Sequence, residues 1–339
     1  MLTARRESVL NAIVEGHIDT VTPVGSQHIA EKWGMTHSPA TVRSEMAALE
    51  QDGYITRPHT SAGGLPTDLG YRTYVRQFLA DPTLGPAEKG RIRQRLVHLA
   101  MDQEGWARSA AEALSGLTGS LAVTTAPKPA RVQLKRIELV PVHDLMVMTL
   151  VVLWGAKVLR QMISLKKSVP PNELTRVSNK LNHLFEGVAP SDIDDAGLDL
   201  SPLEEDVARL VKELMKEEEQ RDLEDPLFEG LRQVFEQPEL AEAEILRDMM
   251  DILEEKGRLK NIMEQVYSGP GIRVAIGGEV RVSTMRHFSL IVSEYGVSDR
   301  VKGVIGIFGP KRMAYRRNIP AVSYLAHLMS DAIQESFPR

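Results

Sequence analysis

The sequence contains no cysteine among its 339 residues. Disulfide bonds and thiolate metal sites are therefore excluded, and a reducing cytoplasm suits such a chain. Long apolar runs are also missing, because the longest, Leu145 to Trp154, is shorter than the roughly 20 residues that a membrane-spanning helix needs. The N-terminal stretch from Met1 to Glu7 lacks the apolar core of a signal peptide. We therefore expect a soluble, cytoplasmic protein with no membrane partner.

A strong excess of basic residues is likewise absent, because the formal net charge is −5. The acidity is concentrated in residues 191–260, which hold 23 Asp and Glu residues against 9 Lys and Arg residues. The rest of the chain has 23 acidic and 32 basic residues, so it is basic overall. The first 80 residues carry 7 basic and 8 acidic residues, which is a weak electrostatic footprint for a nucleic-acid partner. Any affinity for nucleic acid must therefore depend on base contacts and dimerisation as well as on phosphate contacts.

Sequence patterns of catalytic and cofactor sites are missing as well. Gly303, Gly306 and Gly309 have neither P-loop nor dinucleotide-binding spacing. No two of the nine histidines have the i, i+4 spacing of a helical zinc site, and the acidic residues lack the pattern of a calcium loop. Because we find no nucleophile motif either, we expect neither an enzyme nor a bound cofactor.

The sequence does contain a helix that is marked at both ends, from Ser38 to Gly53. Ser38 suits the N-cap, Pro39 the first helical position, and Gly53 the left-handed position after the last turn. Its apolar residues share one face and are Val42, Met46 and Leu49. The opposite face is small, polar and basic near its start, as a helix that enters the DNA major groove requires. An ordinary amphipathic surface helix is the alternative.

The neighbouring residues favour a winged helix-turn-helix. Thr3 can cap a first helix, and Ser26 to Trp33 predict a second one, closed by Gly34. A short helix, a tight turn and a polar-faced helix make a helix-turn-helix. Tyr54 to Arg57 and Leu65 then predict the two strands of a β-hairpin wing, for which a plain surface hairpin is the alternative. A further helix is predicted to follow Thr67.

These elements predict which side chains meet DNA. The residues expected to face base edges are Ala40, Thr41, Arg43 and Ser44. The residues expected to hold phosphates are Ser26, Gln27, Ser38, Arg57, His59, Thr60 and Ser61. Arg43 can form a bidentate contact with a guanine. A two-fold dimer would present two equal helices, which predicts an inverted-repeat target.

Downstream of this domain, the pattern predicts two α+β units. After a linker, the pattern predicts a long helix from Ala87 to Leu117 and then a strand at Leu121. The helix could pack on a dimer mate or within its own domain, and both alternatives are open. Three strands with short breaks between them predict an antiparallel sheet, and they are Lys135 to Val142, Leu145 to Trp154, and Val158 to Leu165. The helices predicted to cover it are Asn172 to Phe185, Pro202 to Arg221, and Pro226 to Phe235. Residues 130–240 are therefore interpreted as an inserted domain.

The pattern resumes after this insert. A helix from Ala241 to Tyr267, with a weak point at Gly257, precedes three strands and a closing helix, which are Arg273 to Ile276, Phe288 to Ser293, Gly303 to Phe308, and Ile319 to Ser336. The basic cluster Pro310 to Arg317 could touch nucleic acid or pair with the acidic segment, and we favour a solvated or intramolecular role.

Several ordered motifs occur along the chain, and they are Pro23-Val-Gly-Ser26, Ser38-Pro-Ala-Thr-Val-Arg43, Pro58-His-Thr-Ser-Ala-Gly63, Pro66-Thr-Asp68, Ile276-Gly-Gly-Glu279 and Gly306-Ile-Phe-Gly-Pro-Lys-Arg-Met313. Together they resemble the family of the heat-inducible transcription repressor HrcA. The resemblance implies a winged helix-turn-helix at 1–80, a discontinuous GAF-like domain at 87–129 and 241–339, and an inserted dimerisation domain at 130–240. It also implies a homodimeric repressor of chaperone genes that binds an inverted-repeat operator and depends on the chaperonin GroEL. Two departures are Gly64, where the family usually has Arg, and Lys311, where it usually has Thr.

Two functional hypotheses follow. In the first, heat exposes apolar strands such as Leu145 to Trp154, and a free chaperonin restores the repressor while an occupied one does not. In the alternative, the protein is a metabolite-responsive winged-helix regulator whose C-terminal domain senses a ligand.

Overall fold

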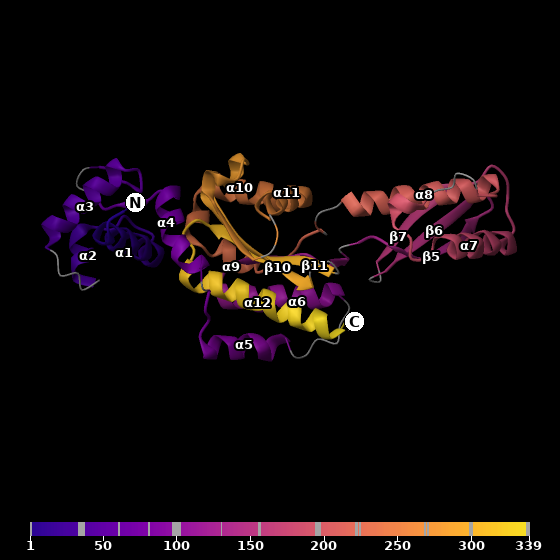
Figure 1. Cartoon of the computed structure of the whole chain (residues 1–339). Helices are drawn as coiled ribbons and strands as arrows, with labels where there is room; N and C mark the ends of the chain where they lie inside the picture. Colours follow the sequence, from indigo (N-terminus) through magenta and orange to yellow (C-terminus); the bar gives the residue numbers. More distant parts are fainter. Residues whose placement is uncertain are drawn as a thin grey trace. The chain divides into compact units, whose positions relative to one another are not determined.

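A computed structural model describes residues 2–32, 38–59, 62–80, 82–96, 103–129, 131–154, 157–193, 198–220, 223, 225–267, 269, 271–297 and 301–336. Over these residues the chain forms twelve α-helices and three antiparallel sheets, so the predicted α+β, multidomain class is confirmed (Figure 1). It divides into two compact units, residues 1–126, 225–295 and 303–339, and residues 127–224 and 296–302. Among the described helices, none combines the length and the apolar character that a membrane span requires.

The first unit begins with three helices and a small hairpin. They are α1 (Ala4–Thr20), α2 (Ser26–Lys32), α3 (Pro39–Gln51), β1 (Ile55–Thr56) and β2 (Leu65–Pro66), and α4 (Asp68–Leu79) follows. β1 and β2 pair antiparallel, as predicted for the wing. The side-chain oxygen of Thr3 accepts from the N–H of Arg6 at 3.4 Å, so the predicted cap of α1 is confirmed. Trp33 and Gly34, where the second helix was predicted to close, lie outside the described residues.

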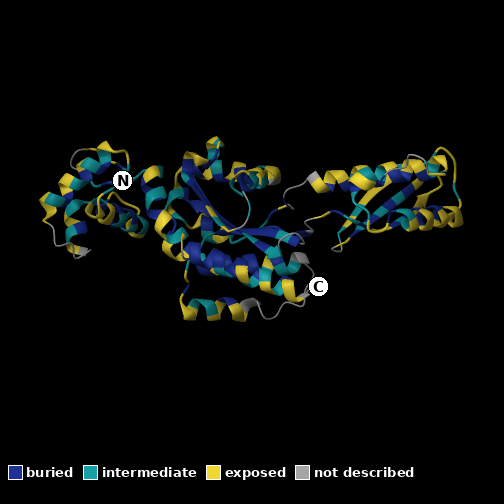
Figure 2. Ribbon diagram, viewed as in Figure 1, coloured by how far each residue is buried: buried dark blue, intermediate teal, exposed yellow. Residues whose placement is uncertain are grey.

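A mixed helix and sheet layer forms the rest of the first unit. Its sheet has the order β8-β3-β11-β10-β9, and its strands are β3 (Leu121–Thr124), β8 (Leu227–Glu229), β9 (Ile272–Ile276), β10 (Phe288–Val297) and β11 (Val301–Pro310). β4 (Lys128–Pro129) pairs with Val301 and Lys302 at the start of β11, and these four residues belong to the second unit. α6 (Gln103–Thr118) and α12 (Tyr315–Ser336) lie along one face of this sheet (Figure 1). Buried residues follow the sheet and the adjoining sides of these helices (Figure 2).

Three predicted helices differ in the structure. The single helix predicted from Ala87 to Leu117 is wrong, because α5 (Pro86–Leu96) packs against α6, which one straight helix cannot do. The helix predicted from Ala241 to Tyr267 is instead α10 (Ala243–Glu254) and α11 (Lys256–Val266), which separate near the predicted weak point. The continuous apolar periodicity hid the break between α5 and α6.

The predicted helix from Pro226 to Phe235 is also wrong. Its first half is β8, which pairs with β3, and only Leu231–Phe235 form a short helix, α9. Gly230 separates the two with a φ of 91°, a left-handed conformation that glycine adopts readily. Because β8 joins the sheet of the first unit, residues 225–240 belong with that unit rather than with the predicted insert.

The second unit is a three-stranded sheet covered on one side by helices. It contains β5 (Leu134–His143), β6 (Met146–Leu153), β7 (Val158–Ser164), α7 (Pro171–Phe185) and α8 (Pro202–Gln220), which confirms the predicted strands and helices. The covered face shares one hydrophobic core with α7 and α8. The backbone N–H of Ile137 donates to Oδ1 of Asn182 at 2.6 Å, and that of Leu139 donates to Oγ of Ser178 at 3.2 Å. Side chains of α7 therefore satisfy the outer edge of β5.

Candidate nucleic-acid interface

The structure places α3 as the sequence predicts. Oγ of Ser38 accepts from the N–H of Thr41 at 3.2 Å, and Gly53 follows the last turn with a φ of 79°. The predicted inner face is buried and consists of Val42, Met46 and Leu49. Four residues of the opposite face are exposed, and they are Ala40, Arg43, Ser44 and Ala47. A narrow, small-residue surface of this kind can enter a major groove without steric obstruction.

Two of the predicted base-facing residues, Thr41 and Arg43, differ in whether their polar groups are free to bind DNA. Thr41 is partly buried, and its Oγ1 lies 3.1 Å from Oγ of Ser38, so the cap already uses this hydroxyl pair. Arg43 is exposed, and its side chain makes no hydrogen bond or ion pair with any other residue that the structure describes. Its five N–H donors are therefore available for an external acceptor.

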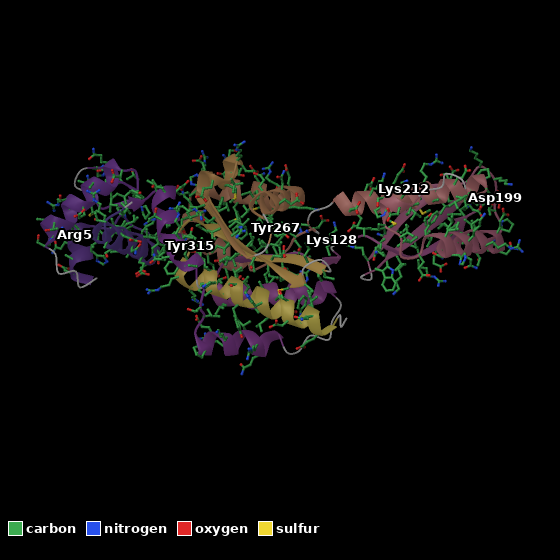
Figure 3. The ribbon with its side chains drawn as sticks, in the orientation of Figure 1. Arg5, Lys128, Asp199, Lys212, Tyr267 and Tyr315 are labelled. Atoms are coloured by element: carbon green, nitrogen blue, oxygen red, sulfur yellow. The ribbon has the colours of Figure 1, made fainter. Side chains whose placement is uncertain are left out.

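The acidic residues of α3 are paired with arginines from flanking elements. Glu45 lies 3.1 Å from Nε of Arg6 and 3.7 Å from a terminal nitrogen of Arg5, which Figure 3 shows at the start of α1. Arg6 also reaches Asp52, just after α3, at 3.2 Å. These pairs reduce the repulsion that carboxylates beside a groove-facing helix would exert on DNA phosphates.

Arg57, a predicted phosphate ligand, is held by a carboxylate of the same domain. Its Nε donates to Oε2 of Glu50 at 2.9 Å. This hydrogen bond lowers the pKa of Glu50 below its ordinary value and raises the pKa of Arg57 above its own, so both groups stay charged. A phosphate would have to compete with Glu50 for this guanidinium. The sequence signal for this pair is the spacing of the two residues, because Glu50 is in the last turn of α3, seven positions before Arg57 in the wing.

The other predicted phosphate ligands fall into three groups. Ser26 is the first residue of α2 and is partly buried, while Ser38 and His59 are exposed. Gln27 is exposed, and its side chain donates to Glu31 at 3.0 Å. Thr60 and Ser61 lie outside the described residues.

Gly64, in the wing, lies against the core of the winged helix. Its N–H and C=O both bond to Val24, at 2.9 and 3.0 Å, and a Cβ here would lie 3.0 Å from Cδ1 of Ile55 and 3.3 Å from Cε of Met46. A side chain at position 64 would therefore start toward the domain core and not toward DNA.

Contacts that sequence reasoning missed join this domain to the rest of the first unit. Nζ of Lys311 lies 2.7 Å from Oδ1 of Asp68, and Nε of Arg72 donates to Glu279 at 2.7 Å. The guanidinium of Arg312 donates to the carbonyl of Ile18 at 2.6 Å. The basic cluster at 310–317 thus has the intramolecular role that the sequence favours. No local pattern could reveal these contacts, because the partners are more than 200 positions apart.

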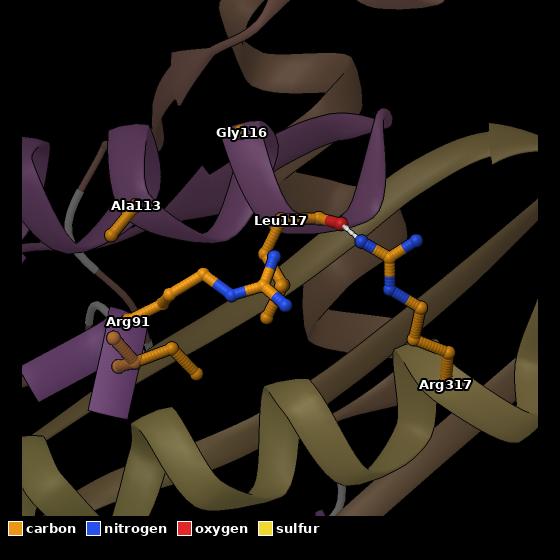
Figure 4. Close-up of a pocket in the computed structure, with 6 residues that line it drawn as sticks. Arg91, Ala113, Gly116, Leu117 and Arg317 are labelled. Carbon is orange, nitrogen blue, oxygen red and sulfur yellow. Dashed lines mark hydrogen bonds between the residues drawn. The ribbon is translucent and has the colours of Figure 1, made fainter. Parts of the chain in front are cut away.

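Pockets in the first unit bear on the ligand-sensing alternative. The guanidinium groups of Arg91 and Arg317 enter a pocket of about 70 Å³, where Arg317 donates to the carbonyl of Leu117 near the end of α6 (Figure 4). A larger pocket of about 380 Å³ is lined by charged residues that include Glu15 and Arg316. Apolar side chains line both pockets as well, among them Ile92 and Leu117 in the first and Ile18 and Leu84 in the second, so the pockets do not decide against this alternative. The described residues contain no cluster of His, Asp and Glu that could hold a metal ion.

Comparisons with known proteins support the functional class that α3 and the wing suggest, a transcription repressor. Residues 104–319 match the HrcA protein C-terminal domain. The heat-inducible transcription repressor HrcA of Dehalococcoides mccartyi is 38% identical, covering 99% of this chain and 97% of the relative. The protein of the same description from Chloroflexus aggregans is 33% identical, covering 99% and 94%. A crystal structure described only as that of a hypothetical protein has the same fold, with a TM-score of 0.66 and 23% identity over 99% of this chain and 100% of that one.

Proposed function

We propose, on the premise that this chain belongs to the family of the heat-inducible transcription repressor HrcA, that it binds an inverted-repeat operator of chaperone genes as a homodimer. The observation that carries this proposal is the exposed face of α3, where Arg43 has no partner among the described residues. Arg43 is assigned to a guanine edge, and Ala40, Thr41 and Ser44 to the neighbouring bases. Ser26, Gln27, Ser38, His59, Thr60 and Ser61 are assigned to phosphates, and Arg57 joins them if a phosphate displaces Glu50.

The uncovered face of the β5-β6-β7 sheet supports dimerisation through the second unit. Its exposed apolar residues are Val140, Val142, Met146, Trp154, Val158 and Met162. Neighbouring strands bring them together, since Met148 pairs with both Val140 and Met162. Arg136, Glu138 and Arg160 share this face, since they pair with Val152 and Leu150, but the apolar side chains around Met148 still need cover in water. A second copy supplies that cover symmetrically, because a two-fold interface uses the same patch on both subunits.

The same face supports the proposed link to heat and to the chaperonin. Leu145 and Trp154 are each 47% exposed in the single chain, at the two ends of the predicted apolar segment. Heating that separates the subunits would uncover this face and release the operator. A free chaperonin would hold the exposed chain and return it to the dimer, and one occupied by heat-damaged proteins would not. Operator binding after a heat pulse should therefore recover with added GroEL and ATP, and recovery to the same extent without chaperonin would contradict this step.

Selection of genomic fragments tests the proposed function itself. Purified protein is mixed with sheared genomic DNA, and the bound fragments are sequenced. We expect fragments upstream of chaperone genes that share one inverted repeat. The same selection with Arg43→Ala serves as the control and should recover no enriched repeat. Enrichment of fragments without a repeat, or an unchanged set with the variant, would contradict the proposal.

A further inference from the structure

A cluster of charged contacts joins the winged helix to the sheet of the first unit, and we call it the α4 junction. It comprises Asp68 and Arg72 on α4, residues 274–279 after and within β9, and Lys311 after β11. Oδ1 of Asp68 accepts from Nζ of Lys311 at 2.7 Å, and Oδ2 accepts from the N–H of Gly278 at 3.0 Å. Arg72 donates to both Glu279, at 2.7 Å, and the carbonyl of Val274, at 2.6 Å. Each α4 charge therefore has two partners across the junction.

Gly277 is required for this close approach. A Cβ at this position would lie 2.3 Å from Oδ2 of Asp68, and the residue has a φ of 52°. The neighbouring Gly278 differs, because a Cβ there would lie at an ordinary 3.7 Å from the same oxygen. The glycine pair of Ile276-Gly-Gly-Glu279 is thus part of the surface on which α4 packs.

Packing and a second polar contact reinforce the junction. The rings of Tyr71 on α4 and Tyr315 on α12 have centroids 5.9 Å apart, and both side chains are buried (Tyr315 is labelled in Figure 3). Arg312 donates to the carbonyl of Ile18, near the end of α1, and to Glu239. The winged helix is therefore held at two of its helices, α4 and α1.

We infer that the α4 junction fixes the orientation of the winged helix and so sets the half-site spacing that the dimer accepts. This inference rests on the proposed function. α3 is the recognition helix, the one proposed to enter the major groove. It contacts α1, and α1 contacts α4, so α3 keeps its position relative to the two helices that the junction holds. Docking fixes α3 relative to the rest of the first unit, so in a two-fold dimer it narrows the range of separations at which the two copies of α3 are presented. Domains released from the junction would be joined to their subunits only through residues 80–85, and would accept several separations. Asp68, Arg72 and Lys311 are thus positioning residues for operator recognition.

The inference gives a role to Lys311, one of the two positions at which this chain departs from the family pattern. The family usually has Thr here, whereas Lys311 reaches the carboxylate of Asp68. The side chains of this pair are 28% and 36% exposed, so salt weakens their attraction. The breadth of accepted spacings should therefore increase with ionic strength in wild type, whereas Lys311→Thr, which lacks this pair, should already accept several spacings at low salt and respond less to added salt.

A series of operators that differ only in spacer length tests the inference. Wild type and the matched control Gly278→Ala should prefer one spacer over its neighbours by about tenfold, because a preorganised dimer loses less freedom on binding. Gly277→Ala should reduce this preference to about twofold and weaken binding at the best spacer by a comparable factor. An unchanged spacing profile in Gly277→Ala, or tighter binding at the best spacer, would overturn the inference.

Further variants separate docking from folding and from operator recognition. Lys311→Thr replaces only a side chain, so it is the test variant if Gly277→Ala fails to fold. The same loss of spacing preference is expected. Gly187→Ala, at a φ of 80° with no atom within 4 Å of a Cβ, controls for backbone strain alone. Hydrogen exchange of the Gly278 amide reports docking without DNA, and it should be faster in Asp68→Ala. If wild type bound no inverted repeat, the proposed function would fail, while slow exchange at Gly278 in wild type and fast exchange in Asp68→Ala would still support the junction.

Discussion

Truncation of Arg43 separates DNA recognition from folding. Its side chain is exposed on α3 and has no partner among the described residues, so Arg43→Ala leaves no buried group unsatisfied. Ala is also the better helix former. We therefore expect the free energy of unfolding to change by no more than about 0.5 kcal/mol.

The loss in operator binding should be much larger. A bidentate arginine–guanine contact contributes about 1–3 kcal/mol of discrimination. A dimer on an inverted repeat makes this contact twice, at sites far enough apart for their energies to add. We therefore expect a loss of about 2–6 kcal/mol, which is at least about a 30-fold increase in Kd.

A gel-shift or fluorescence titration at several salt concentrations measures this effect. If Arg43 contacts a base, the slope of log K against log salt should stay unchanged, whereas a lost phosphate contact would reduce it by about 0.9 per subunit. Arg43→Lys keeps the charge but not the bidentate geometry, so it should lose most of the specificity as well. Arg76→Ala, which removes another exposed arginine on α4, is the matched control and should change Kd little. Equal affinity of Arg43→Ala and wild type would refute the assigned role.

Three further predictions concern charge, assembly and pH. Glu50→Gln should free Arg57 for phosphate, tightening operator binding by about threefold and steepening the salt slope by up to about 0.9 per subunit; weaker binding would contradict the pairing argument. Met162→Glu places a charge on the apolar sheet face and should raise the dimer Kd at least about 100-fold by sedimentation, whereas Leu198→Glu, equally exposed in the same unit, should not. Burial lowers the pKa of His17 below 6.5, so the folded state binds the proton more weakly than the unfolded chain, and stability should fall as the pH drops below 6.5. His17→Gln should flatten this dependence in urea titrations, and an unchanged pH profile would exclude His17 as its source.

Local patterns in the sequence determine much of this molecule. Ser38, Pro39 and Gly53 mark α3, and the four- and three-residue spacing of Val42, Met46 and Leu49 fixes its buried side. The short breaks between β5, β6 and β7 specify neighbouring antiparallel strands in the same way. In each of these elements the deciding residues are close in sequence, so their spacing alone specifies the geometry.

Long-range contacts account for what the sequence did not reveal. The segment after Pro226 has a helical pattern, but pairing with β3 makes its first part a strand. Residues 87–117 keep one periodicity although α5 packs on α6, because both helices bury one face against neighbours. Asp68 and Lys311 meet across 243 positions, so the meaning of Lys311 depends on the tertiary fold. The role of Arg57 likewise depends on Glu50, whose orientation follows from how α3 ends beside the wing.

The absence of native cysteine allows a single label on the recognition helix, which tests the central claim most directly. An iron chelate attached to Ser44→Cys, on the exposed face of α3, cleaves the DNA nearest to that residue. The proposed two-fold arrangement predicts two cleavage centres of equal intensity, placed symmetrically about the centre of the inverted repeat. The same chelate on Gln94→Cys, exposed on α5, controls for cleavage that does not depend on α3. A single centre, or no cleavage from Ser44→Cys on a bound operator, would contradict the claim that α3 is presented twice to the duplex.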